Sequence, residues 1–294
     1  MFFIIIELFL MPILKVTNFM VYSNASKPKN DEKKKKIRIL DIMEMKKNSQ
    51  RISSITCYDA TFARIIESTN IDLVLVGDSL GNVIQGKNTT IKVSVNDIAY
   101  HVSCVSSTLK TPLLVGDMPF ISAGLSRSET THNAGILIQA GAEAVKIEGA
   151  SPEICDHINF LIRHGIPVMG HIGLMPQSVN ALSGFRIQGK NDEDKEKLMN
   201  EAKELQKAGC FAVVLELVTP KTAQFISEAL AIPTIGIGSG NFCDGNILVL
   251  QDMLGMNKQF KPKFLKHFLD LEESIKNAVN NYCGDVKSAK SESI

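Results

Sequence analysis

Tryptophan is absent from this sequence of 294 residues, and aromatic residues make up only 6% of it. An excess of charge of one sign is lacking too, because 32 Lys and Arg stand against 31 Asp and Glu, a formal net charge of +1. Proteins that bind nucleic acids usually carry a clustered basic surface, often with aromatic side chains. The sequence therefore predicts no nucleic-acid partner, and small molecules are the expected ligands.

Paired cysteines are a second absence. The cysteines lie far apart and include no CxxC pair, so the sequence indicates neither a zinc ribbon nor a disulfide framework. Most stand in apolar, strand-like or helical runs, where a free cysteine packs as a small hydrophobic residue. We therefore expect buried free thiols and a reducing compartment. The six cysteines are Cys57, Cys104, Cys155, Cys210, Cys243 and Cys283.

The apolar N-terminal run Met1–Leu14 is interrupted by Glu7 and is shorter than the roughly 20 residues of a membrane span. It lacks the preceding basic residues of a secretory signal and the Arg-rich pattern of a transit peptide. The charge run Asp31–Lys36 follows. We expect residues 1–36 to be a disordered or processed extension, with a signal anchor as the alternative. No stable membrane association is expected, and the predicted location is cytoplasmic, with organelle targeting left open.

From about Ile37 the chain repeats one order: a short apolar run, a polar turn, then a helical pattern. Continuous apolar runs are typical of parallel strands buried on both faces. Eight such units over roughly 240 residues match a (β/α)8 TIM barrel. The predicted strands are Ile52–Cys57, Leu73–Gly77, Leu113–Gly116, Ala144–Ile147, Val168–His171, Ala212–Leu215, Thr234–Ile237 and Ile247–Leu250. The predicted helices include Ala60–Ser68, Val95–Ser107, Ser128–Ala140, Pro152–His164 and Asp194–Ala208.

An open, doubly wound sheet is the structural alternative. It would be expected to carry a Gly-rich turn after its first strand, where this chain has Cys57-Tyr58-Asp59-Ala60. We therefore predict one (β/α)8 catalytic domain over residues 37–282, followed by a polar C-terminal tail over residues 283–294.

Ionisable side chains stand at the carboxyl ends of five consecutive predicted strands. In a barrel these ends converge on one mouth, where active sites are built. Taken singly, each has a structural explanation, such as an Asp that caps a helix. Together they are hard to assign to capping, because several of them end strands without opening an evident cap. The residues are Asp78, Asp117, Lys146, Glu148, His171 and Glu216.

Asp78, Asp117 and Glu148 would supply hard oxygen ligands with no Cys or paired His nearby. Such a set favours Mg²⁺ or Mn²⁺ over tetrahedral zinc. A divalent ion can polarise the keto group of a bound 2-oxo acid, so that proton loss beside it gives a metal-stabilised enolate.

The remaining ionisable groups fit the same chemistry. Glu216 is the expected base, since a carboxylate partly removed from water is a stronger proton acceptor. Lys146 and His171 are expected to neutralise the substrate carboxylate or the enolate oxygen. The sequence therefore predicts carbon–carbon bond formation on a small 2-oxo acid.

Two glycine-containing stretches lie near this mouth. The long segment Ile172–Asp192 shows no clear helical pattern, and loops of that length in compact barrels are usually lids or binding loops. Disorder without function is the alternative. The short stretch Gly236–Asn241 follows the seventh strand, where barrels often bind phosphate. Close approach of the backbone to a cofactor is its other explanation.

At these residues the sequence resembles the ketopantoate hydroxymethyltransferase (3-methyl-2-oxobutanoate hydroxymethyltransferase) family. The matching motifs keep the family's order between about Ile37 and Tyr282, which makes the resemblance specific. They are Thr56-Cys57-Tyr58-Asp59, Val76-Gly77-Asp78-Ser79-Leu80-Gly81, Gly116-Asp117-Met118-Pro119-Phe120, Val145-Lys146-Ile147-Glu148-Gly149, Gly170-His171-Ile172-Gly173-Leu174-Met175-Pro176-Gln177 and Gly236-Ile237-Gly238.

The resemblance implies a barrel of the phosphoenolpyruvate mutase and isocitrate lyase type, one Mg²⁺ per subunit and a homo-oligomer. It implies transfer of a hydroxymethyl group from 5,10-methylenetetrahydrofolate to 3-methyl-2-oxobutanoate, giving 2-dehydropantoate in pantothenate biosynthesis.

By motif position, the resemblance also implies roles for single residues. Glu216 resembles the proton acceptor, and His171 resembles an active-site partner. The metal-binding carboxylates implied are Asp78 and Asp117, with Glu148 beside them. The ketoacid-binding residues implied are Asp78, Ser79, Asp117 and Lys146.

Some positions depart from the family pattern. Ser183 and Phe185 stand where Gly and Tyr are usual, Ser239 stands where Ala is common, and Gln251 replaces a His. Thr131-His132 interrupts an Ala-rich helix pattern. None of these removes a proposed catalytic group, so they put lid behaviour and folate affinity in question rather than activity.

Two other functions are alternatives to the transferase. A carbon–carbon lyase of the same barrel class would be expected to carry a Lys-Lys-Cys-Gly-His-type loop motif, which this sequence lacks. A scaffold that had lost its chemistry would be expected to lose a strand-end carboxylate. All four are present, at Asp78, Asp117, Glu148 and Glu216.

Overall fold

The computed structural model describes residues 34–178, 186–259 and 262–288. The chain divides into two units, residues 1–34 and residues 35–294, and the second contains the barrel. Of the predicted extension, residues 1–36, the first 33 residues lie outside the described part of the chain. Within the described ranges, no helix is long and apolar enough to cross a membrane.

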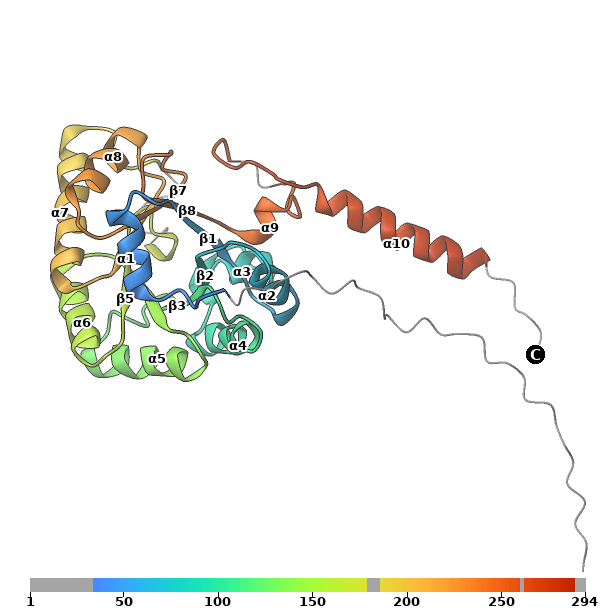
Figure 1. Cartoon of the computed structure of the whole chain (residues 1–294), viewed down its shortest axis with the longest axis horizontal. Coiled ribbons are helices and arrows are strands. Elements are labelled where there is room, and N and C mark those ends of the chain that lie inside the picture. The colour runs from blue at the N-terminus through green and yellow to red at the C-terminus, as the bar shows by residue number, and fades with distance from the viewer. Residues whose placement is uncertain (1–33, 179–185, 260–261, 289–294) are drawn as a thin grey trace, which may run out of the picture. The chain divides into compact units, whose positions relative to one another are not determined.

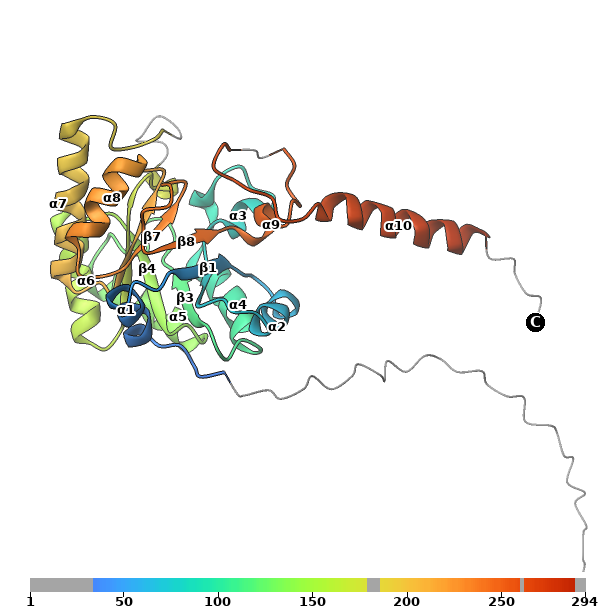
Figure 2. The ribbon, with the colours of Figure 1, turned by 45° about the horizontal axis from the view of Figure 1, so that its top comes forward.

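Eight parallel strands close into a barrel in the order of the sequence, with β8 pairing back onto β1. This confirms the predicted (β/α)8 TIM barrel over the open, doubly wound alternative. Figures 1 and 2 show helices on the outside of the ring of strands. The strands are β1 Ile52–Thr56, β2 Leu73–Val76, β3 Leu113–Asp117, β4 Ala144–Glu148, β5 Val168–Gly173, β6 Ala212–Glu216, β7 Thr234–Ile237 and β8 Gly245–Leu248.

The predicted last strand, Ile247–Leu250, was wrong by two residues at each end, because β8 begins at Gly245 and ends at Leu248. Gly245 is not part of an apolar run. It belongs to the strand because its backbone pairs with Ile52 of β1 and Ile235 of β7. A Cβ at Gly245 would lie 2.4 Å from the carbonyl oxygen of Ile52, so this close approach requires glycine.

Five helices begin directly after a side chain that caps them. Asp59, Ser94, Ser126, Ser151 and Asn191 each accept a hydrogen bond from a backbone N–H of the first helical turn. Helix α1 Ile39–Lys47 precedes the first strand. The helices of the ring are α2 Ala60–Glu67, α4 Val95–Ser106, α5 Arg127–Gln139, α6 Pro152–Arg163, α7 Asp192–Ala208 and α8 Pro220–Ala229. Short turns are α3 Leu80–Val83, α9 Leu250–Met253, η1 Thr90–Lys92 and η2 Pro176–Ser178.

Two apolar clusters hold the barrel together. The larger one fills the space between the strands and the surrounding helices. The smaller one lies inside the barrel toward its amino end, where Ile42 of α1 packs against strand-start residues such as Ile52 and Leu113. Each fully buried aliphatic side chain contributes about 1.5–3 kcal/mol. Helix α1 therefore closes one end of the barrel, and the carboxyl end remains available for a site.

The cysteines are free, as predicted. Cys57, Cys210 and Cys243 are buried, and the other three are partly buried. Burial raises the pKa of the Cys57 thiol to about 11 and that of Cys210 to about 12. These thiols are packing residues rather than nucleophiles.

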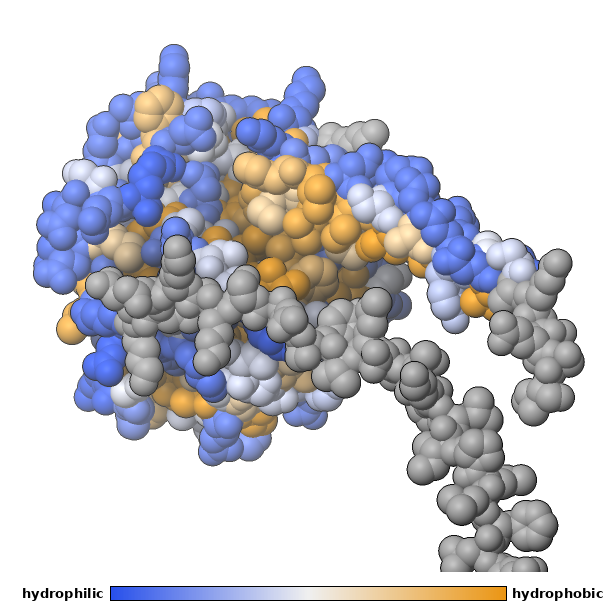
Figure 3. All heavy atoms as spheres, turned by 45° about the vertical axis from the view of Figure 1, so that its right-hand side comes forward, coloured by the Kyte–Doolittle hydropathy of each residue, from blue (hydrophilic) through white to orange (hydrophobic). Residues whose placement is uncertain are grey.

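The C-terminal helix α10 spans Leu271–Ser288 and has no buried residue. The predicted boundary at residue 283 falls inside this helix, so residues 283–288 continue it. Apolar surface gathers beside the segment that leads into α10 (Figure 3). That segment contains the partly exposed Phe264, Phe268 and Leu269. Exposed apolar side chains also follow one another along α10 at Ile275, Val279, Tyr282 and Val286.

Candidate active site

The predicted strand-end residues meet at the carboxyl end of the barrel. The parallel register sets Asp117 beside Lys146 and Glu148 beside His171. One cavity of about 1030 Å³ is lined by all seven residues that the sequence analysis assigned to the site. These are Asp78, Ser79, Asp117, Lys146, Glu148, His171 and Glu216.

Asp78 and Asp117 form an acidic pair at the ends of β2 and β3. The backbone N–H of Asp78 donates to Oδ2 of Asp117 over 2.9 Å, and both side chains are buried. Burial, and then the charge of Asp117, raises the pKa of Asp78 to about 8. Burial also raises the pKa of Asp117, against the pull of Lys146. The positive charge near Asp78 and Asp117 is therefore too small to offset the cost of burying two neighbouring carboxylates.

Lys146 supplies part of that positive charge. Its Nζ lies 2.9 Å from Oδ1 of Asp117 and 3.6 Å from Oε1 of Glu148. Burial opposes its charge, but Asp117, Glu148 and Asp78 outweigh that effect and hold the Lys146 pKa above its ordinary value. Burial likewise opposes the charge on Glu148. There Lys146 and His171 prevail and hold the Glu148 pKa below its ordinary value. Both side chains are therefore charged.

His171 connects this group to Glu216. Its Nδ1 lies 3.4 Å from Oε1 of Glu148 and 3.3 Å from Nζ of Lys146, and its Nε2 lies 3.4 Å from Oε2 of Glu216. Burial and Lys146 act to lower the His171 pKa, but Glu148 and Glu216 raise it to about 9. In either protonation state, Nε2–H can face Glu216. Neutral His171 would accept from Lys146 at Nδ1, and protonated His171 would face Glu148 with that nitrogen.

Glu216 differs from the rest of the cluster in exposure. Its side chain is 19% exposed, against 1% for Asp117 and 4% for Glu148. Leu217 follows it with a left-handed φ of 48°, and such backbone strain is often found at functional sites. A Cβ at Gly173 would lie 2.4 Å from the Glu216 carbonyl, so β5 can approach β6 here only with glycine. The backbone thus presents the Glu216 carboxylate to the cavity.

Gln177 was quoted in a motif, but sequence reasoning gave it no role. Its side-chain Nε2 donates to Oδ2 of Asp78 over 3.1 Å and to the Met118 carbonyl over 3.0 Å. Its backbone N–H donates to Oε2 of Glu148 over 3.2 Å. One residue of η2 therefore contacts groups that follow or end β2, β3 and β4. The Gln177 side chain is neutral, so the sequence contains no charge signal that would have identified it.

Tyr58 was also passed over as a functional group. It is fully buried at the end of β1, and its hydroxyl lies 2.8 Å from Oγ of Ser79. His101 of α4 approaches the Tyr58 carbonyl through Nδ1 at 2.6 Å. The Tyr58 hydroxyl therefore helps to orient Ser79, which the family resemblance implies to be a ketoacid-binding residue.

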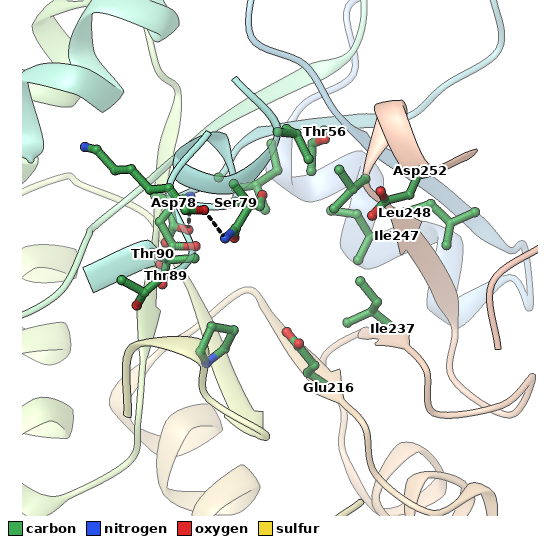
Figure 4. A pocket seen from close by; sticks show the side chains of 18 of the residues that line it. Thr56, Asp78, Ser79, Thr89, Thr90, Glu216, Ile237, Ile247, Leu248 and Asp252 are labelled. Carbon is green, nitrogen blue, oxygen red and sulfur yellow. Dashed lines mark hydrogen bonds between the residues drawn. The ribbon is translucent and has the colours of Figure 1, made fainter. Parts of the chain in front are cut away.

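The two walls of the cavity have different chemistry. Figure 4 shows Asp78 and Ser79 on one side and Ile247, Leu248 and Asp252 on the other, with Glu216 at the edge. The second wall continues as Val249, Asn257, Gln259, Phe264 and Leu265. Pockets of 300–1,000 Å³ are typical for ligands of drug-like size. The cavity therefore has room for more than a small acid.

The donor set fits a hard divalent cation. Among the described residues, no group of three or more His, Cys, Asp and Glu is arranged as a ready-made metal site. Mg²⁺, however, is commonly held by one or two carboxylates and completes its shell with water and substrate. The raised pKa values of Asp78 and Asp117 show that added positive charge would be favourable there. Glu148 as a third ligand stays a prediction, because Lys146, His171 and Gln177 already face it.

Part of the predicted lid lies outside the described residues, including Ser183 and Phe185. Of its described part, Pro176 lines the cavity, and Gln188 forms a β-bridge with Val218. In the stretch Gly236–Asn241, packing requires a glycine at one position, and a role in binding phosphate or a cofactor stays a prediction. A Cβ at Gly238 would meet Leu217 and Phe264, so these side chains close over the backbone.

Two of the noted family departures are accommodated locally. Buried Ser239 donates to the Leu215 carbonyl and accepts from the Val218 N–H. Thr131 donates its hydroxyl to the Arg127 carbonyl inside a continuous α5. Neither disturbs the site.

Comparison with protein families gives one clear match. Residues 36–291 match the model described as ketopantoate hydroxymethyltransferase. Several similar proteins are named 3-methyl-2-oxobutanoate hydroxymethyltransferase. The one from Clostridium botulinum (strain Loch Maree / Type A3) is 48% identical over 248 residues, 84% of this chain and 90% of that protein. The one from Bdellovibrio bacteriovorus is 48% identical over 252 residues, 85% of this chain and 95% of that protein.

Solved structures with low sequence identity share the fold. Phosphoenolpyruvate phosphomutase from Streptomyces platensis subsp. rosaceus matches with a TM-score of 0.58 at 13% identity, covering 85% of this chain and 87% of that one. A 2,3-dimethylmalate lyase, described as a PEP mutase/isocitrate lyase superfamily member, matches with a TM-score of 0.57 at 13% identity, covering 87% and 91%. The chain thus shares its barrel fold with these two proteins.

Proposed function

Because the chain belongs to the ketopantoate hydroxymethyltransferase family, we propose that it transfers a hydroxymethyl group from 5,10-methylenetetrahydrofolate to 3-methyl-2-oxobutanoate, forming 2-dehydropantoate. One observation carries the proposal. A buried group of carboxylates, Lys146 and His171 shares a cavity with the more exposed Glu216, and His171 lies between them. The lyase and scaffold alternatives have no comparable support, since relatives at 46–48% identity carry the transferase name.

Asp78 and Asp117 would hold the Mg²⁺ ion, with Glu148 beside them. A bound divalent cation supplies Lewis-acid polarisation of the substrate's 2-oxo group. The buried Lys146 ammonium, charged as its raised pKa requires, is placed to balance the substrate carboxylate. Ser79 offers a hydroxyl oriented by Tyr58.

Glu216 is the base that takes the proton from C3 of the bound ketoacid. Its partial exposure lets the carboxylate reach the substrate, and its contact with His171 fixes its direction. The carbanionic C3 that results forms the new carbon–carbon bond to the one-carbon unit. Water supplies the oxygen of the hydroxymethyl group as both C–N bonds of the methylene carbon break, and its two protons go to N5 and N10 of tetrahydrofolate. The proton taken from C3 ends on the new hydroxyl group. Cytoplasmic location and a homo-oligomeric state belong to the same proposal.

The test is ¹H NMR of 3-methyl-2-oxobutanoate in D₂O with the purified protein and Mg²⁺, with and without EDTA, before folate is added. Loss of the C3 proton signal that EDTA abolishes is the expected result. Exchange that begins only after folate is added would mean that the co-substrate completes the site. No exchange in either condition would contradict the proposal.

A further inference from the structure

Asp252 is a buried acid on the apolar side of the cavity. It is only 7% exposed, it lines the cavity, and its Oδ1 has no hydrogen-bond partner among the described residues. Burying a carboxylate oxygen without a partner costs free energy, and native structures rarely tolerate it without a reason. The cost indicates that a ligand completes the hydrogen bonding of this side chain.

The fold of α9 does not require Asp252. It stands in a helix of four residues, and no side chain caps that helix. Burial raises the pKa of Asp252, against a side-chain hydrogen bond with Asn257 and the charge of His267. The start of α9 is fixed without Asp252, since Leu250 N–H donates to Oγ1 of Thr56 over 3.1 Å.

The surroundings of Asp252 define the ligand it would take. Next to it, Ile247 and Leu248 give the wall an apolar surface (Figure 4). Phe264 and Leu265 also line the cavity. An apolar wall suits the face of a ring, and a carboxylate in such a wall can accept hydrogen bonds from two neighbouring N–H donors. A heterocyclic ring that carries an amino group next to a ring N–H would supply these two donors.

We propose that Asp252 recognises the 2-amino-4-oxopyrimidine edge of the folate co-substrate, accepting hydrogen bonds from its 2-amino group and from ring N3–H. The inference rests on the proposed function and extends it by assigning the second substrate to the wall opposite Asp78. The ketoacid then occupies the charged wall and the pterin ring the apolar wall. The one-carbon unit is brought between them, toward Glu216.

The experiment compares two probes, tetrahydrofolate and its 2-desamino analogue, binding to the full-length protein with Mg²⁺ by isothermal titration calorimetry. The wild-type protein is expected to bind tetrahydrofolate about 10- to 100-fold more tightly, because a charged hydrogen bond is lost with the amino group. Asp252→Asn should reduce that preference to within about threefold. Equal affinities in the wild-type protein would overturn the inference, whatever the variant does.

Asp244→Asn is the matched control. It makes the same chemical change at the opposite end of the barrel, where Asp244 bonds to Lys46 and Thr234. It should keep the full preference for tetrahydrofolate. A preference retained in Asp252→Asn, or lost equally in both variants, would overturn the inference. Proton exchange at C3 in the wild-type protein is followed separately, and its absence would count against the proposed function instead.

Discussion

The two ends of the barrel treat acidic residues in opposite ways. At the amino end, Asp72, Glu143 and Asp244 each stand one residue before a strand, and each accepts at least two hydrogen bonds from the protein. At the carboxyl end, Asp117 and Glu148 share one partner, Lys146, and burial raises the pKa of Asp78 and of Asp117. The acids of the amino end stabilise the fold, and those of the carboxyl end are held ready for ligands.

This contrast separates stability from function along one axis. Substitutions at the carboxyl end should change binding and rate while the fold persists. Substitutions at the amino end should change the free energy of unfolding while chemistry persists. Four changes, from the largest expected effect to the smallest, can break or sharpen that separation.

Glu216→Gln removes the proposed base and keeps the size of the side chain. Exchange of the C3 proton of 3-methyl-2-oxobutanoate in D₂O should slow by about 10²- to 10⁴-fold, the usual contribution of a positioned base. Metal binding and the melting temperature should stay unchanged, because Glu216 is partly exposed and its contact with the cluster, as far as the described residues show, is through His171. Exchange at the original rate would show that another group takes the proton.

Asp117→Ala removes one proposed metal ligand. Affinity for Mn²⁺, measured by electron paramagnetic resonance as free ion against bound ion, should fall by about tenfold or more. Asp117→Asn is the milder companion, since it retains an oxygen that can accept from the Asp78 N–H. An unchanged metal titration in both variants would remove the assignment.

Asp78→Asn tests the repulsion between Asp78 and Asp117 at the barrel mouth through the pH dependence of stability. The folded-state pKa of about 8 lies above the ordinary 3.8, so between these values the folded protein binds more protons than the unfolded one. Stability of the metal-free protein should therefore fall as pH rises from about 4 to 8, by up to about 1.4 kcal/mol per pH unit. Chemical denaturation across this range should show a flatter profile for Asp78→Asn. Identical profiles would contradict the repulsion.

Asp244→Ala tests the opposite end. It removes the acceptor of Lys46 Nζ and of the Thr234 N–H, both at 2.8 Å. Unfolding in urea should require about 1–3 kcal/mol less, the cost of leaving buried donors unsatisfied. The rate of C3 proton exchange should stay at the wild-type value. A variant that loses exchange but keeps its stability would reverse the comparison.

Much of this architecture could be predicted from the sequence, because buried parallel strands are apolar at nearly every position. All eight strands were located to within two residues at each end, and helix starts followed capping residues such as Ser94 and Ser151. Strand β8 was misplaced because Gly245 enters it through backbone pairing, which leaves no apolar signal.

The charged part of the site was predictable for a similar reason. Asp78, Lys146 and Glu216 interrupt or follow apolar runs, so they stand out, and the closed barrel brings such strand ends together. Gln177 and Tyr58 were missed because neutral side chains act here through contacts 99 and 21 residues away in the chain. Only the folded structure shows which partner each one meets.

The contacts of Gln177 have a consequence for how this barrel can be altered. Loops on barrels are often exchangeable parts, so that new specificities arise by transplanting one loop onto a constant frame. Here the segment after β5 carries a side-chain amide that donates to Asp78, which follows β2, and to the Met118 carbonyl, which follows β3. A transplanted loop would have to bring its own equivalent of Gln177, or the graft would disturb two neighbouring strand ends together with the one it replaces.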